Sequence, residues 1–163
     1  MEYVIRPAVK EDMKQVLDLI QELAEFEKEP DAVEITVSDL EKDGFGEHPK
    51  FVCFVAEVNH RIGGMALVYP RYSTWKGETV HLEDLIVSED LRGTGMGSAL
   101  FEEVIRYGRE KGVRRIEWNV LDWNDGAIRF YERNGARVLR DWDTVQLDEE
   151  GINSFLERID ENI

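Results

Sequence analysis

Three glycines at alternate positions, Gly93, Gly95 and Gly97, lie between an apolar, strand-like run and an amphipathic helix. Glycine allows left-handed backbone conformations and a close approach of another molecule to the main chain. The N–H groups at the start of the helix can then bind a phosphate, whose negative charge the helix dipole also favours. The loop predicts a phosphorylated ligand, and a purely structural turn is the alternative that this loop alone leaves open.

Two common phosphate-binding motifs do not fit the loop. A P-loop needs Gly-Lys-Ser/Thr at the helix start, where this chain has Gly97, Ser98 and Ala99 without a lysine. A dinucleotide fingerprint G-x-G-x-x-G counted from Gly93 needs glycine where this chain has Ser98. The sequence therefore argues against nucleotide hydrolysis and disfavours a Rossmann site.

The loop lies in the middle of an alternating series of predicted strands and helices. A repeat of two residues predicts strands, and a repeat of 3.6 residues predicts helices. Predicted strands cover residues 3–5, 51–58, 62–69, 79–87, 116–120, 136–139 and 144–147. Predicted helices cover about fifteen residues from Glu11, then 38–42, 97–111, 124–134 and the end of the chain from about Glu149, with Gly44, Gly112 and Gly135 ending three of them. This order predicts a mixed α/β fold in one domain spanning residues 1–163.

The predicted strand 79–87 contains a change of phase. Its apolar residues fall on even positions at Val80 and Leu82, and then on odd positions at Leu85 and Val87. Because side chains alternate strictly along a strand, the change predicts a β-bulge near Glu83 and Asp84. A strand buried on both faces is the alternative explanation. Bulges often redirect side chains beside functional sites, so these two carboxylates become candidates for chemistry.

Composition narrows the range of partners. The formal net charge of −15 argues against nucleic acid and favours a small cation, although an acidic surface also simply keeps a protein soluble. The single cysteine, Cys53, excludes an internal disulfide and fits a reducing cytoplasm. No stretch approaches the length of a membrane span, so we expect no membrane partner. The three histidines are scattered, and we expect no metal site.

Two motifs together resemble those of one enzyme family. Arg92-Gly93-x-Gly95-x-Gly97 resembles the pyrophosphate-binding motif of the GNAT superfamily of N-acetyltransferases, and Asn124-x-x-Ala127-x-x-x-Tyr131-x-x-x-Gly135 resembles its second signature. The resemblance covers essentially the whole chain. It implies the GNAT fold, a central, mixed but mostly antiparallel, twisted sheet flanked by helices. It also implies acetyl-CoA as the acetyl donor.

The resemblance extends to the diamine acetyltransferase branch of that superfamily. Segments similar to this branch are Ile5-Arg6-Pro7-Ala8, Asp43 to Pro49, Tyr72-Ser73-Thr74-Trp75, Leu82-Glu83-Asp84 and Val120 to Asn124. Tyr72-Ser73-Thr74-Trp75 and Leu121-Asp122-Trp123-Asn124 look closer to the thialysine-acetylating members. Polyamine-specific members carry an aspartate in the place of Ser73, so the resemblance favours thialysine, a lysine analogue or a diamine over spermidine and spermine.

The resemblance implies roles for particular residues. Glu83 is the implied proton acceptor, directly or through water, and a water chain to another carboxylate is the alternative. Tyr131 is the implied general acid, which protonates the coenzyme A thiolate; a phenol stays protonated at neutral pH and can donate. The implied cofactor-binding residues are Leu85, Ile86, Val87, Arg92, Gly93, Thr94, Gly95, Met96, Gly97, Ser98, Asn124, Ala127 and Tyr131. The implied substrate-binding residues are Phe26, Glu27, Trp75, Glu83, Asp84 and Trp142. Each also has a structural reading, as a core, cap or solvated residue.

The resemblance and the net charge together predict a small cationic amine as substrate. The resemblance also implies a homodimer. Acetylation of a protein or peptide amine is the alternative within the enzyme class. A non-catalytic module that binds acetyl-CoA is the alternative outside it. A module that only binds needs the phosphate loop but neither Glu83 nor Tyr131, so these two residues favour an enzyme.

Overall fold

The computed structural model describes residues 1–162. The chain divides into two compact units, Met1–Leu121 and Asp122–Ile163. No helix within residues 1–162 combines the length and the apolar character that crossing a membrane requires.

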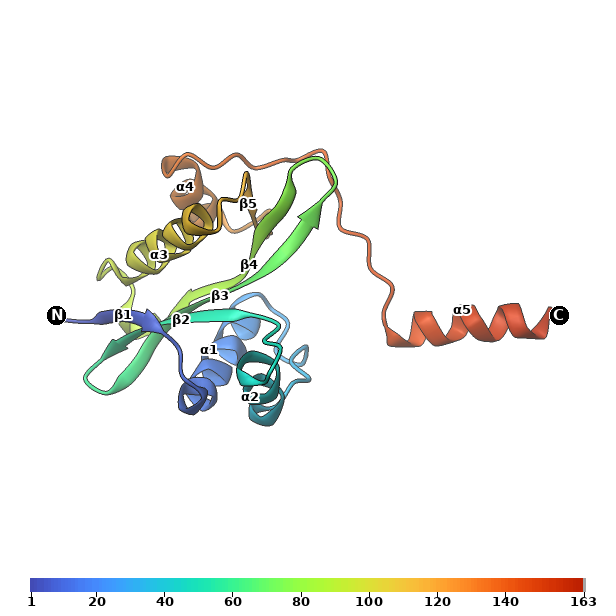
Figure 1. Ribbon diagram of the computed structural model, residues 1–163, viewed down its shortest axis with the longest axis horizontal. Coiled ribbons are helices and arrows are strands. Elements are labelled where there is room, and N and C mark those ends of the chain that lie inside the picture. The colour runs from blue at the N-terminus through green and yellow to red at the C-terminus, as the bar shows by residue number, and fades with distance from the viewer. Residues whose placement is uncertain (163) are drawn as a thin grey trace. The chain divides into compact units, whose positions relative to one another are not determined.

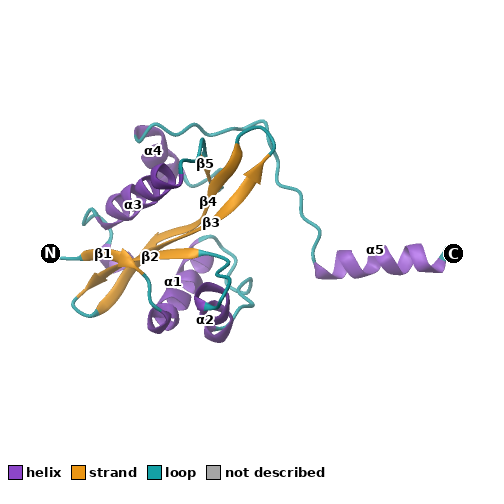
Figure 2. Cartoon of the chain, in the orientation of Figure 1, coloured by secondary structure: helices purple, strands orange, loops and turns teal. Residues whose placement is uncertain are grey.

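The first unit is a sheet with helices on both faces (Figures 1 and 2). Among the described residues the sheet has five strands in the order β1-β2-β3-β4-β5, antiparallel except for the parallel pair β4 and β5. The strands are β1 Val4–Pro7, β2 Val52–Val58, β3 Arg61–Ser73, β4 Gly77–Val87 and β5 Ile116–Glu117. The helices are η1 Lys10–Asp12, α1 Met13–Phe26, α2 Val37–Phe45, η2 Glu89–Leu91 and α3 Met96–Lys111. The mixed, mostly antiparallel sheet predicted from the sequence is confirmed.

The sheet has an apolar core on each face. On one face Ala66 and Val68 of β3 belong to the core with Leu100 and Val104 of α3. On the other face the alternate β3 residues Met65 and Leu67 belong to the core of α1 and α2, with Met13, Val16 and Leu40. Both faces are covered, which is why β2 and β3 are nearly continuous apolar runs in sequence.

A two-residue turn joins β2 to β3. Asn59 and His60 both have positive φ, 50° and 61°, which two-residue hairpin turns of the right twist require. The strands predicted over residues 51–58 and 62–69 thus form a hairpin, and Arg61 is already the first residue of β3. β3 also continues past Tyr69 to Ser73, where a second hairpin leads into β4.

The predicted β-bulge is confirmed at Glu83. Leu67 of β3 lies opposite Asp84, and the next residue, Val68, lies opposite Leu82. Glu83 is therefore the extra residue on β4. The bulge keeps Leu85 and Val87 on the same core face as Val80 and Leu82, although the two pairs fall on odd and even positions.

Two predicted boundaries in the first unit are wrong. Gly44 does not end the short helix, because α2 runs to Phe45 and is followed by Gly46. Gly44 is there for close packing: a Cβ on it would lie 2.4 Å from Cζ of Phe51. The strand predicted over residues 116–120 is shorter than expected, because only Ile116 and Glu117 of β5 pair with β4. Their partners on β4 are Val80 and His81, which lie just before the bulge at Glu83.

The second unit contains α4, Asp125–Arg133, and α5, Glu149–Glu161. Both helices begin where the sequence predicts, with side-chain caps at Asn124 and Asp148. The strands predicted over residues 136–139 and 144–147 are absent from the described residues, where the chain is irregular. Their apolar side chains are exposed, Val145 by 93 % and Leu147 by 64 %. A short β-prone segment becomes a strand only when a neighbour supplies hydrogen bonds and packing, and these segments have neither in the second unit.

Candidate active site

The glycine loop connects η2 to α3. Gly93 and Gly95 have φ of 79° and 88°, values that side chains other than glycine rarely adopt. α3 starts at Met96, and its first hydrogen bond runs from the N–H of Ala99 to the carbonyl of Gly95, 3.0 Å away. The N–H groups of Met96, Gly97 and Ser98 precede that bond and have no carbonyl within the helix to donate to. The loop therefore has the geometry of an anion site at a helix N-terminus.

Gly97 differs from the other two glycines of the loop. It has a helical backbone, and a Cβ built on it would meet Cγ2 of Val87 at 3.6 Å, an ordinary contact distance. The fold of the first unit would accept alanine there. Packing within the first unit therefore does not explain a glycine at this position, and the cofactor role of Gly97 stays a prediction.

Two side chains tie the loop to its surroundings. The hydroxyl of Thr94 donates to the carbonyl of Leu91 at 2.7 Å. Nε of Arg92 donates to the carbonyl of Val87 at 3.2 Å, and its guanidinium carbon lies 5.5 Å from the ring centroid of Phe26. The predicted cofactor residue Arg92 thus connects the end of β4 to the end of α1, which carries a predicted substrate residue.

β4 has one paired edge and one edge that is largely open. Its first edge pairs with β3 along the whole strand, from Gly77 to Val87. Its second edge pairs with β5 only at Val80 and His81, so no strand within residues 1–162 continues that edge from Leu82 onward. An open edge offers N–H and C=O groups to an extended ligand. The predicted cofactor residues Leu85, Ile86 and Val87 lie on this part of β4.

Glu83 is held by two neighbours. The hydroxyl of Tyr69 on β3 donates to Oε2 of Glu83 at 3.1 Å, and Nε2 of His81 lies 3.5 Å from the same oxygen. The Glu83 side chain remains 51 % exposed, so it is anchored and still reachable. Tyr69 and His81 are parts of this site that the sequence did not predict. The available signal is the spacing of His81 and Glu83, because residues two apart on a strand share a face.

Two further carboxylates, those of Asp84 and Glu27, have pKa values raised by their surroundings. Burial, the charge of Glu83 and the charge of Glu27 together raise the pKa of Asp84 to about 6. Burial also raises the pKa of Glu27, which follows the last residue of α1. Anions that disfavour one another are stabilised by a cation placed among them. The charges of the predicted residues Glu27 and Glu83 thus both act on Asp84, and a cation-binding role for the three stays a prediction.

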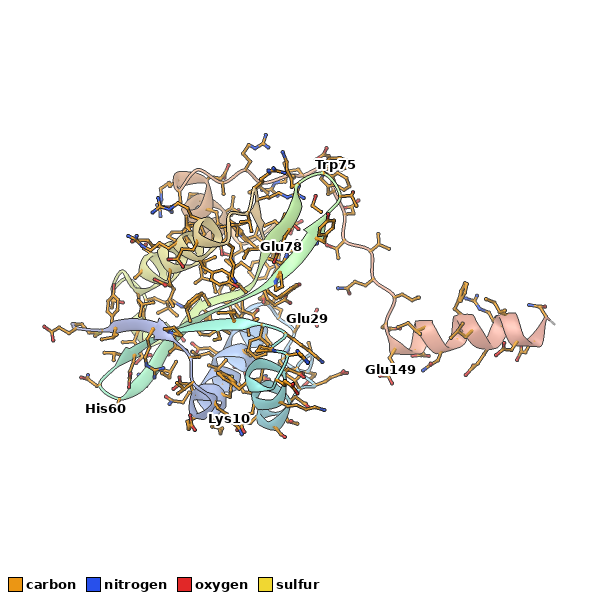
Figure 3. All side chains as sticks on the ribbon, viewed as in Figure 1. Lys10, Glu29, His60, Trp75, Glu78 and Glu149 are labelled. Carbon is orange, nitrogen blue, oxygen red and sulfur yellow. The ribbon has the colours of Figure 1, made fainter. Side chains whose placement is uncertain are left out.

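The aromatic residues predicted for the substrate channel are not all brought to this group. Phe26 immediately precedes Glu27 and is 42 % exposed. Trp75 lies at the tip of the hairpin formed by β3 and β4 and is 80 % exposed (Figure 3). Gly77 and Glu83 are six residues apart on β4, which places them about 20 Å apart along the strand. Trp75 lies in the turn before Gly77 and is therefore far from Glu83 along the hairpin. A substrate role for Trp75 stays a prediction.

The hydroxyl of Ser73 is occupied by the turn at the hairpin tip. Its oxygen accepts hydrogen bonds from the N–H groups of Trp75 and Lys76, both at 3.1 Å. Ser73 therefore shapes the turn through its oxygen and brings no charge to it. An aspartate at this position would place a carboxylate beside the same two N–H groups.

The remaining predicted residues belong to the second unit. The side-chain oxygen of Asn124 accepts a hydrogen bond from the N–H of Ala127 at 3.3 Å, which caps α4. Tyr131 lies on α4 and is half-buried, with its ring 5.5 Å from that of Phe130. Trp142 lies in the irregular segment and is 69 % exposed. The caps and helix of this unit fit the predicted signature, and the roles of these residues stay predictions.

Comparisons with known proteins identify the family. The model of the acetyltransferase (GNAT) family matches residues 13–136. The thialysine N-epsilon-acetyltransferase of Bos taurus is 41 % identical over 144 residues, which cover 83 % of this chain and 85 % of that protein. The human spermidine/spermine N(1)-acetyltransferase-like protein 1 is 35 % identical over 141 residues, 82 % of this chain and 20 % of that protein.

Solved structures agree on the fold. An integron cassette protein from the mobile metagenome of V. cholerae superposes with a TM-score of 0.78 at 22 % identity, covering 96 % of this chain and 99 % of that one. The match to the family model, residues 13–136, includes the glycine loop, the strand β4 with its partly open edge and the bulge at Glu83. This chain belongs to the GNAT family of N-acetyltransferases.

Proposed function

We propose that this N-acetyltransferase transfers the acetyl group of acetyl-CoA to the primary amine of thialysine, a lysine analogue or a diamine. The observation that carries the proposal is a single stretch of chain, residues 83–98. This stretch contains the bulged carboxylate, the open strand edge and the glycine loop in succession. The relatives named for thialysine acetylation support the choice of amine.

In the proposed complex the first unit holds most of the donor. The N–H groups at the start of α3 bind the pyrophosphate, and the open edge of β4 beside Leu85, Ile86 and Val87 pairs with the amide groups of the pantetheine arm. The family resemblance assigns Asn124, the cap of α4, and Ala127 of α4 to the cofactor as well. We propose accordingly that both units belong to one GNAT domain, since the family match runs through residue 121 without a break.

The chemistry needs a proton acceptor because the substrate is an ammonium ion. An amine with a pKa of about 10.4 is neutral in roughly one molecule in 10³ at pH 7. Glu83 accepts the ammonium proton, and the amine nitrogen then attacks the thioester carbonyl. The new C–N bond forms, the C–S bond breaks, and Tyr131 donates its phenolic proton to the departing thiolate. The attacking nitrogen loses its second proton as the amide forms, and the Tyr131 phenolate takes that proton up. Glu83 then releases the ammonium proton to solvent. Glu27 and Asp84 hold the cationic substrate beside Glu83.

The choice of amine is tested by a panel of thialysine, lysine, a short diamine and spermidine. Thiol release is followed with each amine, and the products are identified by mass spectrometry. We expect a mono-acetylated product from thialysine or a diamine and weaker turnover with spermidine. If no amine raises thiol release above the hydrolysis of acetyl-CoA alone, the proposal is wrong.

The hairpin tip gives a second, independent test of selectivity. Ser73→Asp places a carboxylate where polyamine-specific members are expected to carry one. We expect kcat/KM for spermidine to rise relative to thialysine by about tenfold, the equivalent of about 1.4 kcal/mol. Ser73→Asn, which can make the same turn contacts without the charge, is the matched control. Equal effects of the two substitutions would contradict an electrostatic role.

A peptide amine is the second candidate substrate because the net charge of −15 also suits basic peptides. Competition between thialysine and a lysine-containing peptide for one pool of acetyl-CoA separates the two. The non-catalytic alternative is not supported, since the family and the named relatives are enzymes.

We further propose a homodimer in a reducing cytoplasm. The dimer rests on the resemblance to diamine acetyltransferases. The proposal of a reducing compartment rests on the single cysteine, Cys53, whose thiol is buried. Burial, together with the charges of Asp12 and Asp84, raises the pKa of this thiol to about 12. Light scattering of the purified protein tests the dimer, and cell fractionation tests the compartment.

The absence of a metal requirement stays a prediction, tested by activity in the presence of a chelator.

A further inference from the structure

His81 is a buried polar residue that the proposed mechanism does not yet use. It lies on β4 with only 6 % of its surface exposed, directly opposite Tyr69 of β3. The two rings are 5.1 Å apart between centroids and tilted by 39°. An apolar residue would fill this place without the cost of removing an imidazole from water. A buried histidine here therefore calls for a polar partner.

That partner is the carboxylate of Glu83. Nε2 of His81 lies 3.5 Å from Oε2 of Glu83, and the hydroxyl of Tyr69 donates to the same oxygen at 3.1 Å. Burial and the nearby Glu83 charge raise the pKa of Tyr69, so its phenol keeps the proton that it donates. Two groups thus converge on Oε2, which leaves Oε1 as the oxygen that neither of them engages.

The surroundings of the ring decide which nitrogen carries the proton. Nδ1 of His81 is buried and has no hydrogen-bond partner within residues 1–162. A carboxylate only accepts hydrogen bonds, so the nitrogen facing Glu83 must be the N–H. The opposite tautomer would bury an unpaired N–H at Nδ1 and turn a lone pair toward an anion. Of the two tautomers, the one with its proton on Nε2 is therefore favoured.

The bulge explains why Glu83 needs such support. As the extra residue on β4, Glu83 has no partner residue on β3, and half of its side chain is in solvent. A glutamate in that setting populates several rotamers, and only some of them direct an oxygen toward a bound amine. The Tyr69 hydroxyl, which donates to Oε2, and the His81 ring, 3.5 Å from the same oxygen, favour one orientation before the substrate arrives.

We infer that His81 is a positioning residue, which together with Tyr69 orients Glu83 so that Oε1 receives the substrate proton. This inference rests on the proposed function, in which Glu83 is the proton acceptor. It adds a Tyr69–His81–Glu83 group to the site, with only Glu83 touching the amine.

The test is a double-mutant cycle on the full-length protein with thialysine as the amine. His81→Phe keeps a ring but removes the donor, and His81→Leu removes both in case the larger ring does not fit. We expect either variant to lower kcat about tenfold, as loss of orientation does, with the KM for acetyl-CoA unchanged. His81→Gln, whose amide can reach the position of Nε2, should restore most of kcat.

The cycle is completed by Glu83→Gln alone and combined with His81→Phe. If His81 acts through Glu83, the second substitution produces no further loss in the Glu83→Gln background. Thr79→Val is the control for a change on the same face of β4, because Thr79 is fully buried and its hydroxyl donates to the carbonyl of Arg71. It should leave kcat unchanged.

The possible failures are distinguishable. A large loss in Glu83→Gln with wild-type kcat in both His81→Phe and His81→Leu would overturn the positioning role and leave the proposed function standing. Losses that multiply in the double variant would also overturn it, because His81 would then act independently of Glu83. Wild-type kcat in Glu83→Gln would contradict Glu83 as the proton acceptor, and with it both proposals.

Discussion

At the scale of single residues, the site depends on where carboxylates lie relative to one another. Glu83 is anchored by Tyr69 and His81, while Asp84, the next residue, is half-buried and couples to Glu27. Adjacent carboxylates with different surroundings can take different tasks. We assign proton transfer to the exposed and anchored Glu83, and attraction of the cation to the more buried Asp84.

Tyr131 is the residue whose substitution separates catalysis from binding. Tyr131→Phe removes the phenolic proton and keeps the ring, so it should lower kcat by roughly 10²-fold or more while the Kd for acetyl-CoA stays nearly the same. Steady-state kinetics and calorimetric titration with coenzyme A measure the two quantities. The neighbouring Phe130→Leu is a control for changes in α4. Unchanged turnover in Tyr131→Phe would remove Tyr131 from the mechanism.

Asp84 makes a prediction about stability and pH. Burial, Glu83 and Glu27 raise its pKa from 3.8 to about 6, so the folded protein binds this proton more tightly than the unfolded chain does. The stabilisation from this proton is present below about pH 4 and is lost as the pH rises through about 6. Asp84→Asn should therefore raise the free energy of unfolding at pH 7.5 by roughly 1 to 2 kcal/mol, allowing for partial solvent screening, with no gain at about pH 4.

Urea unfolding at the two pH values measures this difference. Asp90 is the matched control with the opposite sign, because hydrogen bonds from Arg61 and Ser88 lower its pKa. Asp90→Asn should lower stability near neutral pH. A gain from Asp84→Asn that is equal at both pH values would contradict the electrostatic explanation.

At the scale of elements, β4 and the start of α3 act as one unit. The bulge at Glu83 follows Val80 and His81, the two β4 residues that pair on both edges, and precedes Leu85, Ile86 and Val87, which pair with β3 alone. Arg92 then binds the carbonyl of Val87, which holds the glycine loop against the end of the strand. The carboxylate, the strand edge and the phosphate loop are thus kept at a fixed spacing by local structure.

Gly97→Ala tests whether the loop serves a ligand. The new Cβ would lie 3.6 Å from Cγ2 of Val87, so we expect no loss of thermal stability, and alanine is the better helix former. In the proposed complex the pyrophosphate lies against the main chain at the start of α3, so the added methyl group should weaken the Kd for acetyl-CoA by about tenfold or more. Calorimetry and a melting curve on the same sample measure both. A weaker Kd accompanied by a lower Tm would indicate a structural role instead.

At the scale of the whole molecule, charge is the property that bears on function. The chain carries 35 acidic and 20 basic residues, which attract cations over distances longer than any single contact. Such long-range attraction is screened within about 10 Å at 0.1 M salt. It therefore contributes to capture of the amine and not to the chemical step.

The KM for thialysine should rise several-fold between about 0.02 and 0.5 M sodium chloride, with kcat unchanged, because salt screens the attraction. Initial rates at saturating acetyl-CoA measure it, and sodium chloride is varied at constant pH. A KM that does not depend on salt would show that contacts inside the site, and not the overall charge, capture the amine.

The sequence by itself determined the features that depend on neighbouring residues. The phase change at Glu83, the caps at Asn124 and Asp148 and the glycine loop before α3 all follow from residues close together in the chain. Backbone preference and side-chain alternation fix such features locally. The family signatures belong to the same class, which is why they could be identified without coordinates.

The tertiary structure decided what depends on residues far apart in sequence. The segments 136–139 and 144–147 have the composition of strands but no pairing partner in their unit, and Gly44 serves the packing of Phe51 and not a helix end. The contact of Tyr69 and His81 with Glu83 requires the register between β3 and β4. Pairing partners and register arise from long-range packing, and a single sequence does not state them. The glutamate could be chosen from the sequence, whereas the groups that hold it could be found only in the sheet.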